Sequence, residues 1–215
     1  LGKAAAYPLL TLSLILLLDL VFGLVKARPL ADIENPLSGR TGVGLGSLIL
    51  VILVSALFTF FASALTEELG FRGYLLSNLR GLGRRRALLI SALLFGLWHI
   101  PPSLILLDSN VERTALYALN IALLGIVLGT LFFDSGSLVP CALCHGLWNA
   151  LEYTLFGYGN MRAVFTGSSR TLFDPEEGLV GTLVLLAFSL IAFRNLSLKS
   201  RPAPVPERSA VLGQG

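Results

Sequence analysis

The chain has 215 residues, of which 54% are hydrophobic and only 13% are charged, and its mean hydropathy is +0.79. Soluble domains carry about 25% charged residues, so this composition excludes an ordinary water-soluble enzyme. The formal charge of +3 does not indicate binding to nucleic acid. The basic residues lie between apolar blocks, where they set the orientation of membrane proteins.

Six apolar blocks follow one another along the chain, each near the roughly 20 residues that a spanning helix requires. Lipid offers no partner to open backbone groups, so we expect an all-α, polytopic transmembrane helix bundle with at least six spans and no strands. The blocks cover residues 4–25, 43–66, 87–107, 114–133, 138–156 and 178–193. We assign residues 1–200 to one transmembrane domain and residues 201–215, with three prolines and no apolar block, to a disordered tail.

The basic residues predict how the bundle sits in the membrane. Arg80, Arg84, Arg85 and Arg86 form the densest cluster, and such clusters mark cytoplasmic loops. Following the remaining spans from there places the C-terminal tail on the same side and the loop 158–177 on the opposite side. We expect a multi-pass protein of the plasma membrane, with its basic loop and C-terminus cytoplasmic.

Glycines four residues apart predict close helix contacts. Gly125 and Gly129 lie within the fourth block, and Gly42 and Gly46 repeat the spacing at the start of the second. Small residues at this spacing let helix backbones approach each other in membranes. We therefore expect both pairs to lie at helix contacts.

The second block runs into charged residues, which are costly inside a bilayer and therefore require a partner or a function. Glu68 and Arg72 are four apart, so on a helix they share a face and can form an ion pair. Glu67 is rotated from Glu68 by about 100° and is left free by this pairing. The alternative interpretation is that the two glutamates merely begin a cytoplasmic loop.

The third block contains a histidine directly before a proline pair. His99 precedes Ile100, Pro101 and Pro102, and prolines that free carbonyls on the preceding turn kink membrane helices. We expect a bend at His99 that opens room for water. The alternative is a core histidine that bonds a backbone carbonyl.

The fifth block contains the second of only two histidines in the chain. His145 and Asn149 are four apart and therefore lie one turn from each other on one helix face. Two stacked donors of this kind can converge on a single oxygen. The alternative is hydrogen bonding between helices, which contributes about 0.6 kcal/mol.

Together these groups provide the parts for amide hydrolysis without a nucleophilic side chain. Glu67 would act as general base on a water, and His99 would hold and orient that water. His145 and Asn149 would donate hydrogen bonds to the oxygen that becomes negative in the tetrahedral intermediate, where the loss of one donor costs about a hundredfold to a thousandfold in rate.

In these motifs the chain resembles the CPBP family of intramembrane glutamic proteases, also called the CAAX prenyl protease 2 or ABI family. The family pattern is Glu-Glu-x-x-x-Arg, then Phe-x-x-x-His, then His-x-x-x-Asn. Here it reads Glu67 to Arg72, Phe95 to His99 and His145 to Asn149. The resemblance covers about residues 57–152, and the family often has about eight spans.

The resemblance implies an intramembrane endopeptidase without a metal or other cofactor. It implies that Glu67, His99, His145 and Asn149 are catalytic, that Glu68 and Arg72 support the first motif, and that the site opens towards the cytoplasm. The implied partners are the lipid bilayer and a peptide or protein substrate, with prenylated and membrane-associated substrates included. Some prokaryotic members are linked to bacteriocin immunity. The oligomeric state is left open.

Three other functions stay open from the residues alone. Glu67, His99 and His145 could bind zinc, with a water as fourth ligand, although the chain lacks the His-Glu-x-x-His helix of many zinc proteases. Buried Glu, His and Arg could instead form the relay of a proton-coupled transporter, or the motif could remain in a non-enzymatic immunity protein. The spacing from Cys141 to His145 matches that of haem attachment, but it lies within an apolar block and indicates buried cysteines only.

Overall fold

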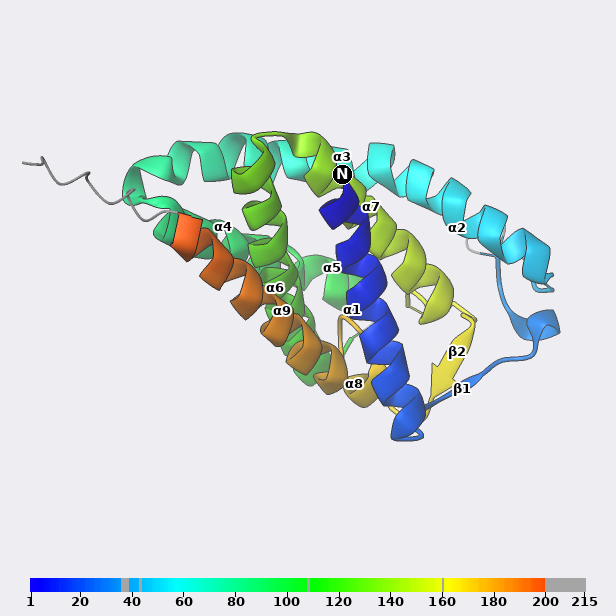
Figure 1. The fold of residues 1–215 in the computed structure, drawn as a ribbon. Coiled ribbons are helices and arrows are strands. Elements are labelled where there is room, and N and C mark those ends of the chain that lie inside the picture. The colour runs from blue at the N-terminus through cyan, green and yellow to red at the C-terminus, as the bar shows by residue number, and fades with distance from the viewer. Residues whose placement is uncertain (36–38, 43, 108, 160, 200–215) are drawn as a thin grey trace, which may run out of the picture.

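The structure is a computed structural model that describes residues 1–35, 39–42, 44–107, 109–159 and 161–199 (Figure 1). The predicted tail, residues 201–215, lies outside the described residues. The α-helices are α1 (Gly2–Val21), α2 (Leu45–Thr59), α3 (Leu65–Glu68), α4 (Arg84–Trp98), α5 (Ile100–Ile105), α6 (Val111–Ser135), α7 (Leu138–Leu155), α8 (Arg170–Phe173) and α9 (Leu179–Lys199). The other helical segments are η1 (Leu30–Asp32), η2 (Phe60–Ala64), η3 (Leu69–Leu76) and η4 (Leu79–Leu82).

The predicted all-α membrane bundle is confirmed. Among the described residues, five helices are long and apolar enough to cross a membrane: Gly2–Val21, Gly46–Leu76, Arg84–Ile105, Val111–Ser135 and Leu179–Leu196. The fifth predicted block corresponds to α7, which forms a helix of 18 residues but is not among these five. Its polar side chains, including His145, Asn149 and Glu152, lower its hydropathy, and all three are buried inside the bundle.

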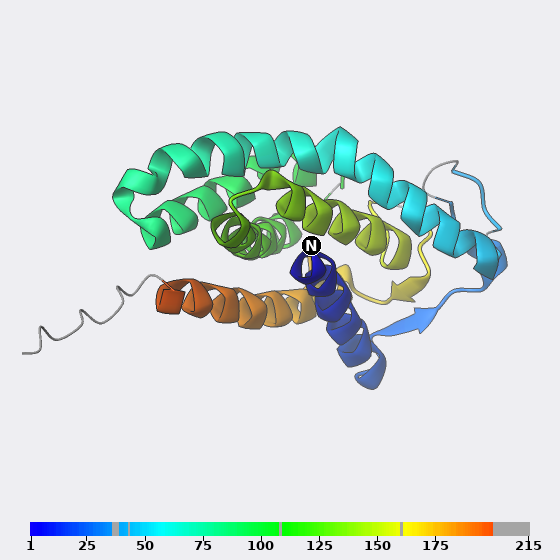
Figure 2. The same ribbon diagram turned by 45° about the horizontal axis from the view of Figure 1, so that its top comes forward.

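The second predicted span ends later in the structure than the sequence suggests. α2, η2, α3 and η3 form one continuous helical segment, which crosses the bundle above α7 (Figure 2). Glu67 and Glu68 therefore lie within a helix, not at the start of a loop as the alternative interpretation holds. η2 and η3 are π-helical, a conformation that often occurs at functional sites.

α6 and α7 form the interior of the bundle. α6 packs against α4, α7 and α9, while α7 packs against α1 and α2 (Figure 1). Of the helices that can cross a membrane, α6 is the most buried, with 61% of its apolar window inside the protein. The surrounding helices expose leucines and other apolar side chains on their outer faces, as lipid contact requires.

Close contacts at glycines fix the distance between α4 and α6. A Cβ atom on Gly125 would lie 3.2 Å from Ala92 Cα, and one on Gly129 would lie within 3 Å of a Leu88 methyl group. The predicted helix contact is therefore present at this pair. The prediction is wrong for Gly46, where an added Cβ atom would meet no other segment within 4 Å. The start of α2 projects beyond the other helices (Figure 2).

The expectation that strands are absent is wrong at one place. β1 (Val25–Ala27) and β2 (Phe165–Gly167) form a short antiparallel pair, in which Val25 is the partner of Gly167. β1 begins at the last residue of the first apolar block and β2 lies between the fifth and sixth blocks, where backbone groups need not be satisfied within one helix. Three residues are too short to give a sequence pattern, but the pair connects the end of α1 to the segment before α8.

Candidate active site

One carboxylate and two imidazole groups, each from a different part of the helical bundle, meet in its interior. Glu67 lies on α3, His99 at the junction of α4 and α5, and His145 on α7. The Glu67 Oε2 atom is 3.6 Å from His99 Nε2 and 4.0 Å from His145 Nε2. The structure thus brings together three of the four side chains that the sequence predicts to be catalytic.

The residue that follows Glu67 belongs to a buried ion pair. Arg72 Nη1 donates to Glu68 Oε1 at 2.8 Å, and the two side chains are 1% and 0% exposed. The pair predicted from the four-residue spacing is therefore present. Arg72 Nη2 also donates to the Gly125 carbonyl oxygen at 3.2 Å, and its guanidinium lies 4.3 Å from the centre of the Phe95 ring. These contacts compensate for the removal of the charges from water.

Glu68 has a second partner that the sequence did not indicate. His145 Nδ1 lies 3.0 Å from the same Glu68 Oε1 atom. A carboxylate oxygen can only accept a hydrogen bond, so Nδ1 carries the proton and donates a hydrogen bond to Glu68. The ring is thereby oriented with Nε2 towards Glu67. Glu68 accordingly connects the Arg72 guanidinium to one of the candidate catalytic imidazoles.

His99 is positioned by the interruption that the prolines cause. α4 ends at Trp98 and α5 begins at Ile100, because Pro101 and Pro102 lack the N–H groups that would continue the helical bonds. His99 Nδ1 contacts the Phe95 carbonyl oxygen at 2.8 Å. A carbonyl oxygen only accepts, so Nδ1 is the donor and Nε2 faces Glu67 with its lone pair. The carbonyl bond of the alternative interpretation is thus present and orients the ring.

A glycine brings α7 close to the helix that carries Glu67. A Cβ atom on Gly146 would lie 3.0 Å from the Phe60 backbone, and Thr59 Oγ1 donates to the Gly146 carbonyl oxygen at 2.8 Å. This contact fixes the position of His145 relative to Glu67. Asn149 lies one turn further along α7, on the same face.

The four candidate catalytic side chains line one cavity of about 230 Å³. Apolar and aromatic side chains make up most of the remaining wall, as is usual for substrate cavities. The cavity is lined by Glu67, His99, His145 and Asn149, by Phe95, Trp98, Pro102, Leu106, Ile121 and Leu124, and by Tyr117, Tyr153, Tyr158 and Glu176.

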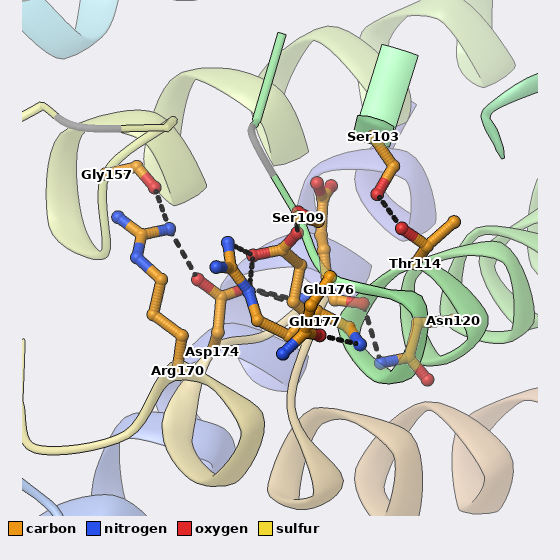
Figure 3. A network of polar contacts seen from close by, with 11 residues as sticks. Ser103, Ser109, Thr114, Asn120, Gly157, Arg170, Asp174, Glu176 and Glu177 are labelled. Atoms are coloured by element: carbon orange, nitrogen blue, oxygen red, sulfur yellow. Dashed lines mark hydrogen bonds and ion pairs between the residues drawn. The ribbon is translucent and has the colours of Figure 1, made fainter. Parts of the chain in front are cut away.

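The sequence analysis gave no role to Glu176, which lines this cavity. It belongs to the segment 174–177, where Asp174, Glu176 and Glu177 are 2%, 5% and 2% exposed. Figure 3 shows this segment held against α6 by hydrogen bonds and ion pairs. The signal in the sequence is three acidic residues directly before an apolar block, which resembles an ordinary solvent-exposed loop.

Burial changes the acidity of groups at this end of the cavity. It raises the pKa of Glu176 from 4.5 to about 8, and neighbouring Asp174 and Glu177 add to the shift, although the Trp148 N–H opposes it. Burial also raises the pKa of Asp174, against the attraction of Arg170. It raises the pKa of Tyr158 to about 12, with Glu176 as the next cause. Glu176 is therefore largely protonated at neutral pH.

The geometry bears on the alternatives that involve metals and cysteines. Across the described ranges, no group of three or more His, Cys, Asp or Glu side chains is placed to hold a metal ion. Cys141 and Cys144 are free and buried, and Cys141 Sγ donates to the Leu128 carbonyl oxygen. Both cysteines are thus buried side chains of α7, and Cys141 packs against α6.

Comparison with known proteins adds one finding. Residues 46–151 match a family described as Rce1-like, type II CAAX prenyl endopeptidase Rce1-like. No curated protein and no solved structure matches the chain. The matched region contains all six side chains of the predicted site, whereas Glu176 lies outside it. The resemblance inferred from the three motifs is therefore confirmed.

Proposed function

Because residues 46–151 belong to the Rce1-like family of CAAX prenyl endopeptidases, we propose that this membrane protein hydrolyses a peptide bond with a water activated by Glu67. One observation carries the proposal. Glu67 Oε2 lies 3.6 Å and 4.0 Å from the Nε2 atoms of His99 and His145, which come from other helices. Their cavity has the polar and apolar groups of a substrate site.

In the proposed first step, Glu67 and His99 hold and activate the water. Both separations around Glu67 Oε2 exceed an ordinary hydrogen bond, so one water can bridge the groups. Its two O–H groups point to Glu67 Oε2 and His99 Nε2, which both accept. A lone pair of the water oxygen then faces the carbonyl carbon of the peptide. As the C–O bond forms, Glu67 removes one proton from the water.

The intermediate carries a negative oxygen, for which His145 and Asn149 supply donors. His145 Nδ1–H is held by Glu68, so Nε2 donates when the imidazole carries protons on both nitrogens. The Asn149 amide, one turn away, provides a neutral donor. Glu67 then returns its proton to the amide nitrogen, and the C–N bond breaks to release an acid and an amine.

Cleavage by the purified protein tests these roles. Wild type, Glu67→Gln and His99→Ala are compared in detergent on a library of prenylated and unprenylated CAAX-type peptides, with Glu112→Gln as control because Glu112 is an exposed carboxylate. We expect wild type and Glu112→Gln to cleave equally. The Glu67 variant should lose cleavage by at least about a thousandfold with an unchanged half-life of thermal unfolding, because it lacks only the general base. Equal cleavage by Glu67→Gln would contradict the assignment.

The same protein separates the other candidate functions. A zinc protease loses activity with a chelator and regains it with Zn²⁺, whereas we expect cleavage to resist the chelator. A transporter would drive uptake by a proton gradient in vesicles and leave peptides intact. An immunity protein that keeps the motif for packing alone would protect cells equally well with Glu67→Gln.

The proposed orientation places the basic loop in the cytoplasm. α4 has 15 residues and is therefore about 22 Å long, so His99 and the cavity lie in the half of the bundle farther from Arg84. The side on which the basic loop lies and the side towards which the cavity opens are therefore separate questions. Cysteine labelling tests the first. Ser168→Cys should react with an impermeant thiol reagent on intact cells, while Gly81→Cys should react only after lysis. The reverse pattern would invert the orientation.

A further inference from the structure

The backbone and side chain of Glu176 are both held in place beside the cavity. The Glu176 N–H donates to Asp174 Oδ1 at 3.0 Å, and its carbonyl oxygen accepts from Asn120 Nδ2 at 2.9 Å. Its side-chain Oε1 atom accepts from Trp148 Nε1 at 2.7 Å. Trp148 is fully buried and directly precedes Asn149 on α7. Glu176 is therefore fixed to the helix that carries two of the candidate catalytic side chains.

The neighbours of Glu176 have cationic partners, but its own side-chain partner is neutral. Arg113 Nε donates to Glu177 Oε2 at 3.0 Å. Arg170 Nη1 donates to Asp174 Oδ2 at 3.0 Å (Figure 3). Both guanidinium groups thus compensate the adjacent carboxylates. An indole N–H stabilises a buried negative charge much less than a guanidinium does. The surroundings therefore favour the neutral acid at Glu176.

Apart from His99 and His145, which line the same cavity and face Glu67, the other titratable groups around Glu176 do not provide a cation. They are Glu67 on α3, Tyr117 on α6, Glu152 and Tyr153 on α7, and Tyr158 in the loop that follows α7. Acids and phenols either add negative charge or remain neutral. An ionised Glu176 would consequently be a second anion in the cavity beside Glu67.

A neutral carboxyl group in this position has a free donor. Its Oε1 atom accepts from Trp148, so the other oxygen can carry the proton and donate to an acceptor in the cavity. The backbone of a bound peptide presents carbonyl oxygens as acceptors. Two carboxyl groups in one cavity, one ionised and one neutral, are a recurrent arrangement in enzymes that divide base and donor roles.

We propose that Glu176 is a positioning residue that works as a neutral acid, donating a hydrogen bond to a carbonyl oxygen of the bound peptide. The inference rests on the proposed function, since it assigns a further residue to the same site. Ionisation of Glu176 removes this donor and places a second negative charge near the anionic intermediate. The raised pKa of Glu176, about 8, predicts where activity declines at alkaline pH.

A fluorescence titration tests the neutral acid independently of cleavage. The chain has two tryptophans, so Trp98→Phe leaves Trp148, which donates to Glu176, as the single reporter. We expect the Trp148 emission to change with a midpoint near pH 8. The transition should persist when Glu112→Gln is added and should disappear with Glu176→Gln, which cannot ionise. A transition that remains in Glu176→Gln, or none in the parent protein, overturns the inference.

The pH dependence of kcat/KM tests the positioning role. Above pH 8, wild type should lose about tenfold per pH unit, whereas Glu176→Gln should stay level. At pH 7, Glu176→Gln should retain more cleavage than Glu176→Leu, because the amide still accepts from Trp148 and donates to the peptide. Glu176→Leu should raise KM by about tenfold at every pH, since it lacks the hydrogen bond.

The outcomes separate the two proposals. If wild type cleaves but Glu176→Gln keeps the alkaline decline, the inference is wrong and the proposed function stands. If wild type cleaves no peptide, the proposed function is wrong and the peptide-binding role of Glu176 falls with it. The fluorescence titration then decides only whether Glu176 is a neutral acid.

Discussion

The buried pair of Glu68 and Arg72 gives the sharpest prediction for stability. Glu68→Ala leaves Arg72 with two of its contacts, the Gly125 carbonyl oxygen at 3.2 Å and the Phe95 ring at 4.3 Å. The guanidinium is 1% exposed, so water cannot replace the carboxylate. Removing one member of such a pair costs about 3 to 5 kcal/mol. His145 Nδ1 also loses its acceptor.

A graded series separates the electrostatic from the catalytic part of this role. Glu68→Gln keeps an acceptor for both partners and should lose less stability than Glu68→Ala. The double variant Glu68→Leu with Arg72→Leu removes both charges, and well-packed apolar replacements of buried pairs are often neutral or stabilising. We expect the double variant to regain most of the stability but not the activity, because His145 still lacks its carboxylate partner.

The assay is the rate of thermal unfolding in detergent, since unfolding of membrane proteins is commonly irreversible and a half-life is then the meaningful quantity. Cleavage is measured on the same samples, with Glu112→Ala as the control for loss of an exposed carboxylate. A wild-type half-life in Glu68→Ala would refute the assignment of the pair to stability. Recovery of activity in the double variant would refute the role of Glu68 in orienting His145.

Three further predictions follow from the packing, the site and the buried acids. Gly96→Ala should destabilise the protein by about 1 to 3 kcal/mol, because its Cβ atom would meet the Ala118 carbonyl oxygen, whereas Gly46→Ala, with no neighbour within 4 Å, should leave the unfolding half-life unchanged. Asn149→Ala should lower kcat by about a hundredfold to a thousandfold, and an unchanged kcat would remove it from the site. Because the pKa of Glu176 is raised, between pH 4.5 and about 8 the folded protein keeps a proton on this side chain that the unfolded chain has already released. Thermal stability should therefore fall as the pH rises through this window, and Glu176→Gln should flatten the dependence.

The sequence by itself determined the class of fold and the core of the candidate site. Long apolar blocks can only be helices in lipid, and charged or imidazole side chains within them are too costly to be incidental. The four-residue spacing indicated the pairing of Glu68 with Arg72, because side chains one turn apart on a helix lie close enough to meet. Local geometry decides such features, so they can be read from adjacent positions in the chain.

Only the tertiary structure decided which remote groups join them. Glu176 reaches the cavity because Trp148 and Asn120, on different helices, bind its side chain and backbone. The contact of His145 with Glu68 and the short strand pair likewise depend on where separate elements pack. None of these has a periodic pattern, since the partners lie far apart in sequence and their encounter depends on how the helices pack against one another.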